Sequence, residues 1–315
     1  MTCLNTAPAR FLGFDVAKDT VTLADTHSRI TRTIPNKRRA IRSALGSCGS
    51  DCLVVCEPTG GHEALLLEEA LRAGVPCHRA DTLKVKAFIR SFGTLAKTDA
   101  IDAAHLASYG RERWKSLALW TLPDADETRL QALVRRRRDL VAMKVAEQNR
   151  AKAPGARPLA CLFKAMLVAI ERQTKAIEQR IDTLIAQSRR LKQRLAVLTT
   201  MTGIGRHTAA CLVGLMPELG SLSRRQAASL ARLAPHPNDS GTHAGYRRMR
   251  GGRPEIPTIL FMPALAAANG KGEFAAFYKR LLDNGKKPIV AIAAVMRKIV
   301  VTLNARLRDA NIQQS

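Results

Sequence analysis

Four carboxylates in the first third of the chain have the positions that a metal site requires. Asp15 ends a short apolar run, and Glu57 directly follows a continuous one. Asp99 and Asp102 stand three positions apart near the start of an expected helix, so their side chains point to the same face of it. Ligand chemistry in an open α/β sheet gathers at strand ends. We therefore expect these four acids to converge on one spot.

The chemistry that such a cluster would support is metal-assisted phosphoryl transfer. Carboxylates held close together repel one another unless a positive charge lies between them. Mg²⁺ (or Mn²⁺) supplies that charge and prefers oxygen ligands, and two such ions would stabilise the attacking and leaving oxygens. Taken singly, each acid fits an ordinary turn, cap or surface position. Their conjunction favours a metal site, with Lys97 placed either to touch a phosphate or to remain a solvated surface lysine.

A second group of reactive residues lies in the loop expected over 235–254, whose prolines and glycines exclude a long helix. Because Ser240 lies in this loop, we expect it to be exposed. Four arginines follow it closely: Arg247, Arg248, Arg250 and Arg253. A serine beside guanidinium groups could attack a phosphodiester while they hold the developing charge, although a turn serine in a phosphate-binding loop is the simpler interpretation. Two residues of the loop are weaker candidates for nucleophilic or acid–base roles: His243 and Tyr246.

Residues 197–214 predict a helix–hairpin–helix. Gly203 and Gly205 lie between two apolar helical stretches, and the small residues Ala209 and Ala210 permit close helix packing. Glycines let backbone N–H groups approach a phosphate, and a helix start favours an anion. The motif indicates sequence-independent binding to the nucleic-acid backbone, and an ordinary tight turn between helices is the alternative.

The elements that must position the four acids follow a recognisable order. Alternating and apolar runs predict strands at 11–15, 20–26, 29–34, 52–56 and 75–80. Amphipathic stretches predict helices at 37–47, 62–73, 83–92 and 99–113. The short links between the first three strands indicate an antiparallel meander. Three strands followed by strand–helix alternation is the order of the ribonuclease H-like nuclease fold, so the N-terminal part is expected to be α/β.

The rest of the chain is predicted to be almost entirely helical. We expect a helix over 128–150, a linker over 151–158, a helical pattern over 159–197 and a final helix over 286–308. The stretch 159–197 carries a narrow apolar stripe, which suits either a coiled-coil partner or packing within its own domain. The expected domains are therefore an α/β catalytic domain, a coiled-coil-like arm and a mostly α-helical C-terminal domain, spanning 8–128, 129–197 and 198–310.

The charge of the chain indicates a polyanionic partner. The 315 residues contain 51 Lys and Arg against 26 Asp and Glu, a net charge of +25, and 35 of the basic residues are arginine. Residues 1–128 hold 17 basic and 15 acidic side chains, whereas 129–315 hold 34 and 11. Guanidinium groups suit bidentate phosphate contacts. This balance favours nucleic acid over a merely soluble basic surface.

Several other classes of protein are disfavoured. The chain contains no run of about 18 apolar residues, so no membrane-spanning helix is predicted, and no signal peptide is recognised. The seven cysteines are most simply reduced thiols in a cytoplasm. Three of the cysteines lie four positions apart: Cys48, Cys52 and Cys56. No second pair of metal-ligand residues follows them, which disfavours a zinc site.

At these residues the chain resembles a known family. It is similar to insertion-sequence transposases that have an N-terminal DEDD, RuvC-like domain and a C-terminal serine-bearing transposase domain, relatives of certain site-specific DNA invertases. The similarity spans about residues 11–308. The matching stretches occur in this order: GFDVAKDT, VVCEPTGG, AKTDAIDAAHLA, MTGIGRHTAA and LARLAPHPNDSG.

The resemblance implies more than the residues do. It places the Mg²⁺-binding acids at Asp15, Glu57, Asp99 and Asp102, and the serine that links covalently to DNA at Ser240. It also implies a structured guide RNA that pairs with target and donor DNA. The family works as an oligomer in the bacterial cytoplasm, with an active site that joins the RuvC-like domain of one protomer to the serine domain of another.

The function expected from the sequence is therefore that of a DNA recombinase that inserts and excises a mobile element. Two alternatives stay open at this point. One is a metal-dependent endonuclease, such as a junction resolvase, which cuts without serine chemistry. The other is a nucleic-acid-binding scaffold with an inactive acid cluster, which would bind tightly and in a salt-sensitive way without cutting.

Overall fold

The structure is a computed structural model that describes residues 3–28, 30–93, 96, 98–241, 245 and 247–312. The chain divides into two compact units, Met1–Leu122 and Pro123–Ser315. Each unit has hydrophobic cores of its own, since the buried apolar clusters of the first and of the second share no residue. All seven cysteines are free thiols, as the sequence predicts.

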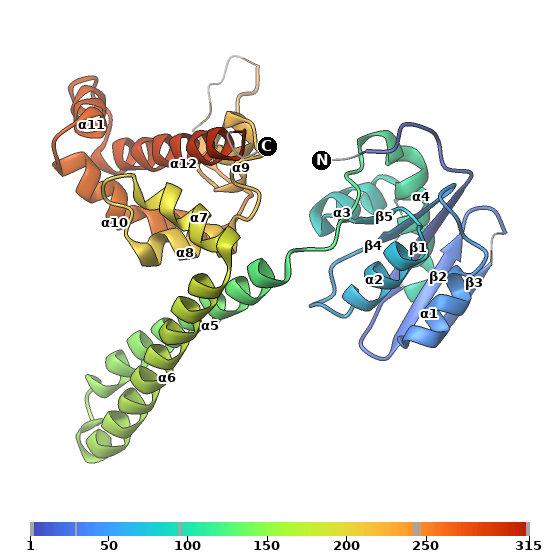
Figure 1. The fold of residues 1–315 in the computed structure, drawn as a ribbon, viewed down its shortest axis with the longest axis horizontal. Helices are drawn as coiled ribbons and strands as arrows, with labels where there is room; N and C mark the ends of the chain where they lie inside the picture. The colour runs from blue at the N-terminus through green and yellow to red at the C-terminus, as the bar shows by residue number, and fades with distance from the viewer. Residues whose placement is uncertain are drawn as a thin grey trace. The chain divides into compact units, whose positions relative to one another are not determined.

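The first unit is built on a mixed five-stranded sheet in the order β3-β2-β1-β4-β5 (Figure 1). Its strands are β1 Arg10–Val16, β2 Thr20–Asp25, β3 Thr31–Pro35, β4 Cys52–Cys56 and β5 Cys77–Arg79. The expected meander is confirmed, because β1 pairs antiparallel with β2 and β2 with β3. Strands β1, β4 and β5 run parallel, which requires the helical crossovers that the alternating pattern predicts.

Helices cover both faces of this sheet. They are α1 Arg38–Leu45, α2 Ala64–Arg72, α3 Thr82–Ser91 and α4 Asp99–Arg113, followed by a short 3-10 helix, η1, at Trp114–Ser116. Buried residues of α1 and α2 pack with Leu12 and Phe14 on one face. Buried residues of α3 and α4 pack with Phe11, Leu53 and Val55 on the other. Successive side chains of a strand alternate between faces, so Asp15 shares the α3–α4 face with Phe11.

The second unit is almost entirely helical among its described residues. Its elements are α5 Ala125–Ala151, η2 Arg157–Leu159, α6 Ala160–Gln187, α7 Arg189–Thr199, α8 Arg206–Leu215, α9 Arg224–Leu230, β6 Pro235–His236, β7 Arg248–Met249, α10 Glu255–Asn269, α11 Glu273–Asp283 and α12 Pro288–Ile312. Helices α5 and α6 lie side by side as a long hairpin (Figure 1). The arm expected over 129–197 thus belongs to this second unit.

The helical pattern expected over 159–197 is confirmed, but it forms two helices because the chain breaks at Ser188. The backbone of this residue is extended (φ −97°, ψ 109°), and it separates α6 from α7. Leu191 and Leu198 on α7 are fully buried. The 3.6-residue pattern continues through the break, so it could not reveal the change of direction. On the far side of the break, Arg190 and Arg194 form ion pairs with Glu127 of α5.

Helix α12 is long and apolar, and its place in the fold explains why. By length and composition it could cross a membrane, and it is the one such helix in the described part of the chain. Ten of its residues are nevertheless buried within the second unit, including Val295, Val300 and Leu303. Its apolar character is that of a core helix.

Candidate active site

The four predicted acids line one pocket of about 470 Å³ in the first unit. Asp15 belongs to β1, Glu57 follows β4, and Asp99 and Asp102 lie in the first turn of α4. The pocket also has lining residues from α3 and neighbouring segments: Thr82, Val85, Lys86, Ile89, Arg90, Ala96 and Leu106. The structure therefore brings together acids from three separate segments.

Strand register explains how Asp15 and Glu57 become neighbours. Phe14 of β1 stands opposite Cys56 of β4 in a parallel pair. One residue further along each chain, Asp15 and Glu57 follow the same register at the carboxyl edge of the sheet. Both are half-buried. Their proximity is a consequence of two parallel strands that end at the same level.

Close packing of α4 against β1 brings the other two acids to this edge. A Cβ atom added to Gly13 would lie 2.0 Å from the carbonyl oxygen of Ala103 and 2.4 Å from the backbone nitrogen of Ala107. Only glycine allows this approach. The side chain of Thr98 accepts a hydrogen bond from the Ile101 amide and caps the helix. The capped first turn presents Asp99 and Asp102 to the pocket.

A buried glutamate shapes the loop that follows Glu57. The Glu63 carboxylate is 3% exposed and accepts hydrogen bonds from the amides of Thr59 (3.0 Å) and Gly61 (2.9 Å). Gly61 has a φ of +105°, which side-chain-bearing residues rarely adopt. The motif CEPTGG in the sequence signals the turn, but the role of Glu63 in closing it is visible only in the structure.

The carboxylates influence one another electrostatically. Burial raises the pKa of Glu57, and the negative charges of Asp15 and Asp102 raise it further, while Lys86 opposes the shift. A raised carboxyl pKa means that the charged form is disfavoured at this position. The pocket consequently has an excess of negative charge that a bound cation would relieve.

The donor set fits a divalent metal in its chemistry, because four carboxylates offer the hard oxygen ligands that Mg²⁺ and Mn²⁺ prefer. Within the described part of the chain, no group of three His, Cys, Asp or Glu side chains is placed to hold a metal ion. The residues that would hold the ion are those that line the pocket.

Two basic residues in this pocket were not anticipated from the sequence. Lys86 and Arg90 stand four positions apart on α3, both line the pocket, and both are exposed. Their positions suit contacts with phosphate groups of a nucleic acid. The i, i+4 spacing was the available signal. Lys97, for which the sequence left open a phosphate contact or a solvated surface position, lies outside the described residues.

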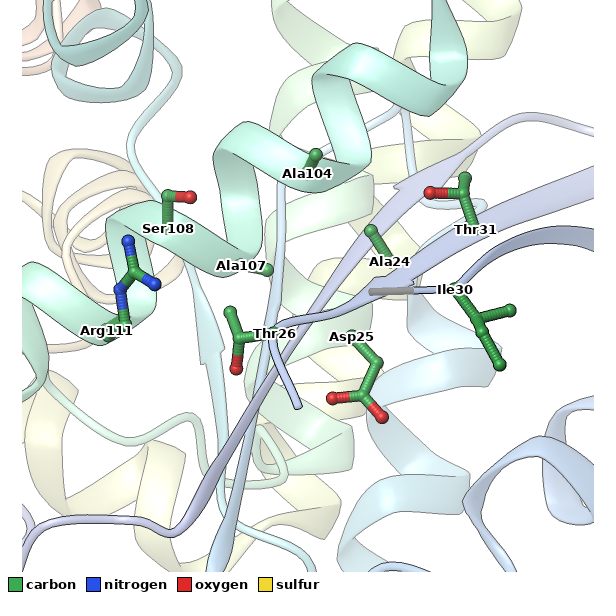
Figure 2. Close-up of a pocket in the computed structure, with 9 residues that line it drawn as sticks. All are labelled: Ala24, Asp25, Thr26, Ile30, Thr31, Ala104, Ala107, Ser108 and Arg111. Carbon is green, nitrogen blue, oxygen red and sulfur yellow. The ribbon is translucent and has the colours of Figure 1, made fainter. Parts of the chain in front are cut away.

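Another hollow in the first unit has a different character. It encloses about 240 Å³ between α4 and the β2–β3 edge, and Figure 2 shows Ser108 and Arg111 among its lining residues from α4. Its one acid is Asp25, which forms a 2.7 Å ion pair with Arg10. None of the four predicted carboxylates lines it, so it offers no metal-binding chemistry.

In the second unit, the turn at Gly203 and Gly205 lies between α7 and α8. Gly203 has a φ of +90°, and Gly205 precedes the first residue of α8. A Cβ added to Gly205 would meet no atom within 4 Å, so the backbone there is open to an approaching group. Ala209 and Ala210 are buried in the core behind the turn. This arrangement suits a phosphate at the start of α8.

Ser240 is exposed on the loop that joins β6 to β7. Pro235 pairs with Met249 and His236 with Arg248 at the base of the hairpin. The arginines predicted to bind phosphate in the same stretch are also exposed: Arg247, Arg248 and Arg250. His243 and Tyr246, the rival candidates of this loop, lie outside the described residues.

An ion pair anchors the end of this loop. Arg253 donates two hydrogen bonds of 2.6 Å to the carboxylate of Glu218. Burial raises the pKa of Glu218, but the hydrogen bonds and charge of Arg253 outweigh burial and leave the pKa lowered. A bidentate pair fixes orientation as well as distance. The serine hairpin is thus tied to the helical core at its C-terminal end.

These features define a class of protein. A carboxylate pocket at the edge of an α/β sheet can hold the ions that assist phosphoryl transfer. A second unit rich in arginine suits a polyanionic substrate. The combination is that of a protein that processes nucleic acid.

Comparison with known proteins narrows the class to a family. A family model described as "Transposase", for DEDD transposases of the IS110 type, matches residues 12–153. A second, described as "Transposase IS116/IS110/IS902 family", matches residues 195–279. Together they cover more than two thirds of the chain. The chain belongs to the IS110 family of transposases, recombinase enzymes that act on DNA and whose DEDD motif suggests dependence on a divalent metal.

Similar proteins from other organisms agree with this assignment. The pilin gene-inverting proteins of Moraxella lacunata and Moraxella bovis are each 29% identical over 264 residues, which cover 81% of this chain and 80% of theirs. An uncharacterized 43.6 kDa protein of insertion element IS110 from Streptomyces coelicolor is 32% identical over 151 residues, which cover 47% of this chain and 36% of that protein.

Proposed function

We propose that this transposase cuts and rejoins DNA strands to insert and excise a mobile element, using a ribonuclease H-like N-terminal domain and a serine nucleophile in the C-terminal domain. The observation that carries the proposal is the convergence of Asp15, Glu57, Asp99 and Asp102 on one pocket. The pilin gene-inverting relatives fit the same chemistry, because inversion also cuts and rejoins DNA.

The four acids would hold Mg²⁺ or Mn²⁺ at the sheet edge. A divalent ion bound there supplies charge stabilisation to the oxygens of the scissile phosphate. Lys86 and Arg90 bind the flanking phosphates and orient the strand over the carboxylates. The excess negative charge around Glu57 supports this role, since the acids repel one another in the absence of a cation.

Ser240 would supply the nucleophile. Its Oγ attacks the phosphorus of a phosphodiester and loses its proton, the bond to the departing sugar oxygen breaks, and that oxygen takes up a proton. A phosphoserine diester then holds one strand end until the hydroxyl of another strand end attacks it and restores Ser240. Arg247, Arg248 and Arg250 stabilise the developing negative charge, and the Gly203–Gly205 turn of the helix–hairpin–helix binds the DNA backbone.

The partners of this reaction are DNA, a structured guide RNA and further copies of the chain in a bacterial cytoplasm. The RNA follows from the family resemblance, and the basic second unit is suited to hold it together with DNA. The α5–α6 hairpin exposes apolar side chains that suit contact between copies: Val141, Met143, Val145, Met166 and Val168. The acid pocket of one protomer and the serine of another would then form a composite site.

Covalent trapping tests the proposal. The full chain is mixed with Mg²⁺, RNA from the flanking region and labelled element-end DNA, and the products are separated on a denaturing gel. We expect a protein–DNA adduct that is absent for Ser240→Ala and for Asp15→Ala. Two control variants keep the adduct: Ser221→Ala, an exposed serine of the second unit, and Asp19→Asn, an exposed acid outside the pocket.

Each other outcome of the trapping experiment identifies one of the alternative functions. Cleavage without an adduct, unchanged in Ser240→Ala, removes the serine mechanism and leaves a metal-dependent endonuclease, an activity for which the acid pocket alone would suffice. Salt-sensitive binding with no cleavage in either Mg²⁺ or Mn²⁺ leaves a binding scaffold.

A further inference from the structure

A pocket of about 530 Å³ lies at the base of the serine hairpin in the second unit. Its volume falls within the roughly 300–1,000 Å³ typical of small-molecule sites. The lining residues come from the hairpin, the turn after α11 and the start of α12: Leu233, Pro235, Arg247, Met249, Gly285, Lys286, Lys287, Val290, Ala293, Ala294 and Arg297. Neither the four acids nor Ser240 is among them.

Four cations surround this pocket without a carboxylate to balance them. They are Arg247, Lys286, Lys287 and Arg297, and all four are exposed. Within the described ranges, none of their side chains has an ion-pair or hydrogen-bond partner. Neighbouring basic residues do have partners, since Arg253 pairs with Glu218 and Lys298 with Glu273. Four unpaired positive charges around one hollow favour an anionic occupant.

The wall of the pocket is apolar. Met249 and Val290 are 39% and 40% exposed, and Leu233 and Ala293, which also line the pocket, are buried. Methionine is polarisable and makes favourable contacts with aromatic rings. The occupant that fits both features has a flat apolar part and negative charges close beside it, which describes a nucleotide.

The hairpin places this pocket near the proposed nucleophile. Pro235 lines the pocket, and Ser240 is five residues further along the chain, a reach of at most roughly 18 Å. A strand whose phosphate lies at Ser240 would therefore have its next few nucleotides within range of the pocket. The alternative occupant, an apolar segment of a second copy, belongs to a chain of net charge +25 that the four cations would repel.

Building on the proposed recombinase function, we propose that this pocket takes one unstacked nucleotide of the DNA strand beside the serine loop. The base packs against Met249 and Val290, and the flanking phosphates bind the four cations. Enzymes that modify a base hold it unstacked in a pocket, and proteins that hold a single strand combine a basic groove with surfaces on which bases pack. Here the captured nucleotide fixes the register of the strand relative to Ser240.

The test compares two DNA duplexes of mixed sequence that bind to the full chain. One carries a single unpaired 2-aminopurine nucleotide, and the other is fully paired. We expect the wild-type chain to bind the first about tenfold more tightly, with a change in 2-aminopurine fluorescence. Val290→Trp fills the pocket and removes the preference, whereas Ile289→Trp, at an exposed neighbour that does not line the pocket, keeps it.

A second pair of variants avoids the risk that the bulky substitution disturbs folding. Lys286→Gln with Lys287→Gln should reduce the salt dependence of binding by about two phosphate contacts. Lys271→Gln with Lys279→Gln removes the same charge at exposed positions outside the pocket and leaves the salt dependence nearly unchanged.

Two results would overturn the inference: equal affinities of the wild-type chain for both duplexes, and a preference that survives Val290→Trp. If Val290→Trp keeps the preference but abolishes a self-association of the chain, the pocket belongs to a second copy. None of these results depends on strand cleavage, so the binding experiment can fail or succeed independently of the trapping experiment.

Discussion

The surroundings of Glu57 link the carboxylate pocket to the stability of the fold. It is half-buried at the end of β4, and burial together with Asp15 and Asp102 raises its pKa. A carboxyl whose pKa is raised on folding stabilises the fold below its unfolded pKa, and this contribution is lost as the pH rises through the folded pKa. At neutral pH the charged Glu57 therefore lowers stability unless a cation binds.

Glu57→Gln is predicted to separate stability from activity. Without metal at neutral pH the variant unfolds at a higher temperature than the wild-type chain, and this gain disappears on acidification below the ordinary glutamate pKa. Mg²⁺ raises the unfolding temperature of the wild-type chain but not of the variant. Strand exchange falls roughly 100-fold or more, since even outer residues of metal sites cost 10–100-fold.

Thermal unfolding across the acid-to-neutral range, with and without Mg²⁺, checks this prediction. Glu112→Gln is the matched control, because it removes an exposed acid of α4 outside the pocket. A Glu57→Gln chain that Mg²⁺ still stabilises as much as the wild-type chain would show that the ion binds elsewhere.

At the scale of elements, the contact between β1 and α4 determines the site. The two elements meet at Gly13, where an added Cβ would lie 2.0 Å from a backbone oxygen of α4. The nearest atoms belong to the backbone of α4, so no flexible side chain can move aside to relieve the clash. The same contact sets how far the first turn of α4, with Asp99 and Asp102, stands from Asp15. Stability and the metal site therefore depend on one close approach.

Gly13→Ala is predicted to destabilise the first unit by about 3 kcal/mol, the upper range for overpacking. Gly46→Ala is the control, since its nearest non-neighbour atoms lie 3.5 Å away and its φ is −62°; a change within about 0.5 kcal/mol is expected. Both tryptophans, Trp114 and Trp120, belong to the first unit. Their fluorescence during urea unfolding reports on this unit, and equal midpoints for the two variants would contradict the packing argument.

At the scale of the whole molecule, the net charge and the hydrophobic cores both divide at the boundary between the two units. Residues 1–122 hold 17 basic and 12 acidic side chains, and residues 123–315 hold 34 and 14. The buried clusters of the two units share no residue. This division separates the unit that bears the carboxylate pocket from the unit that holds most of the net positive charge.

We predict that a fragment spanning 123–315 folds and retains most of the salt dependence of DNA binding. Each neutralised phosphate contributes about −0.9 to the slope of log affinity against log salt concentration. A fragment spanning 1–122 should fold and bind the same duplex only weakly. Fluorescence anisotropy at several salt concentrations measures both slopes. A steeper slope for the 1–122 fragment would contradict this division.

Much of the first unit could be predicted from local sequence. The meander, the buried strand at 52–56 and the helix from Asp99 follow from periodicity and turn residues, which act over a few positions. The gathering of the four acids was predictable because each stands at the end of an element, and such ends meet at one edge of a sheet.

Other features are visible only in the tertiary structure, because they depend on contacts between residues far apart in the chain. The break at Ser188 leaves the apolar pattern intact, so only packing reveals it. Lys86 and Arg90 enter the acid pocket because α3 lies over the same sheet face as α4. Composition counts every cation, but only the fold shows which have acidic partners. Local sequence encodes the elements and their reactive residues, and long-range packing selects the surfaces on which they meet.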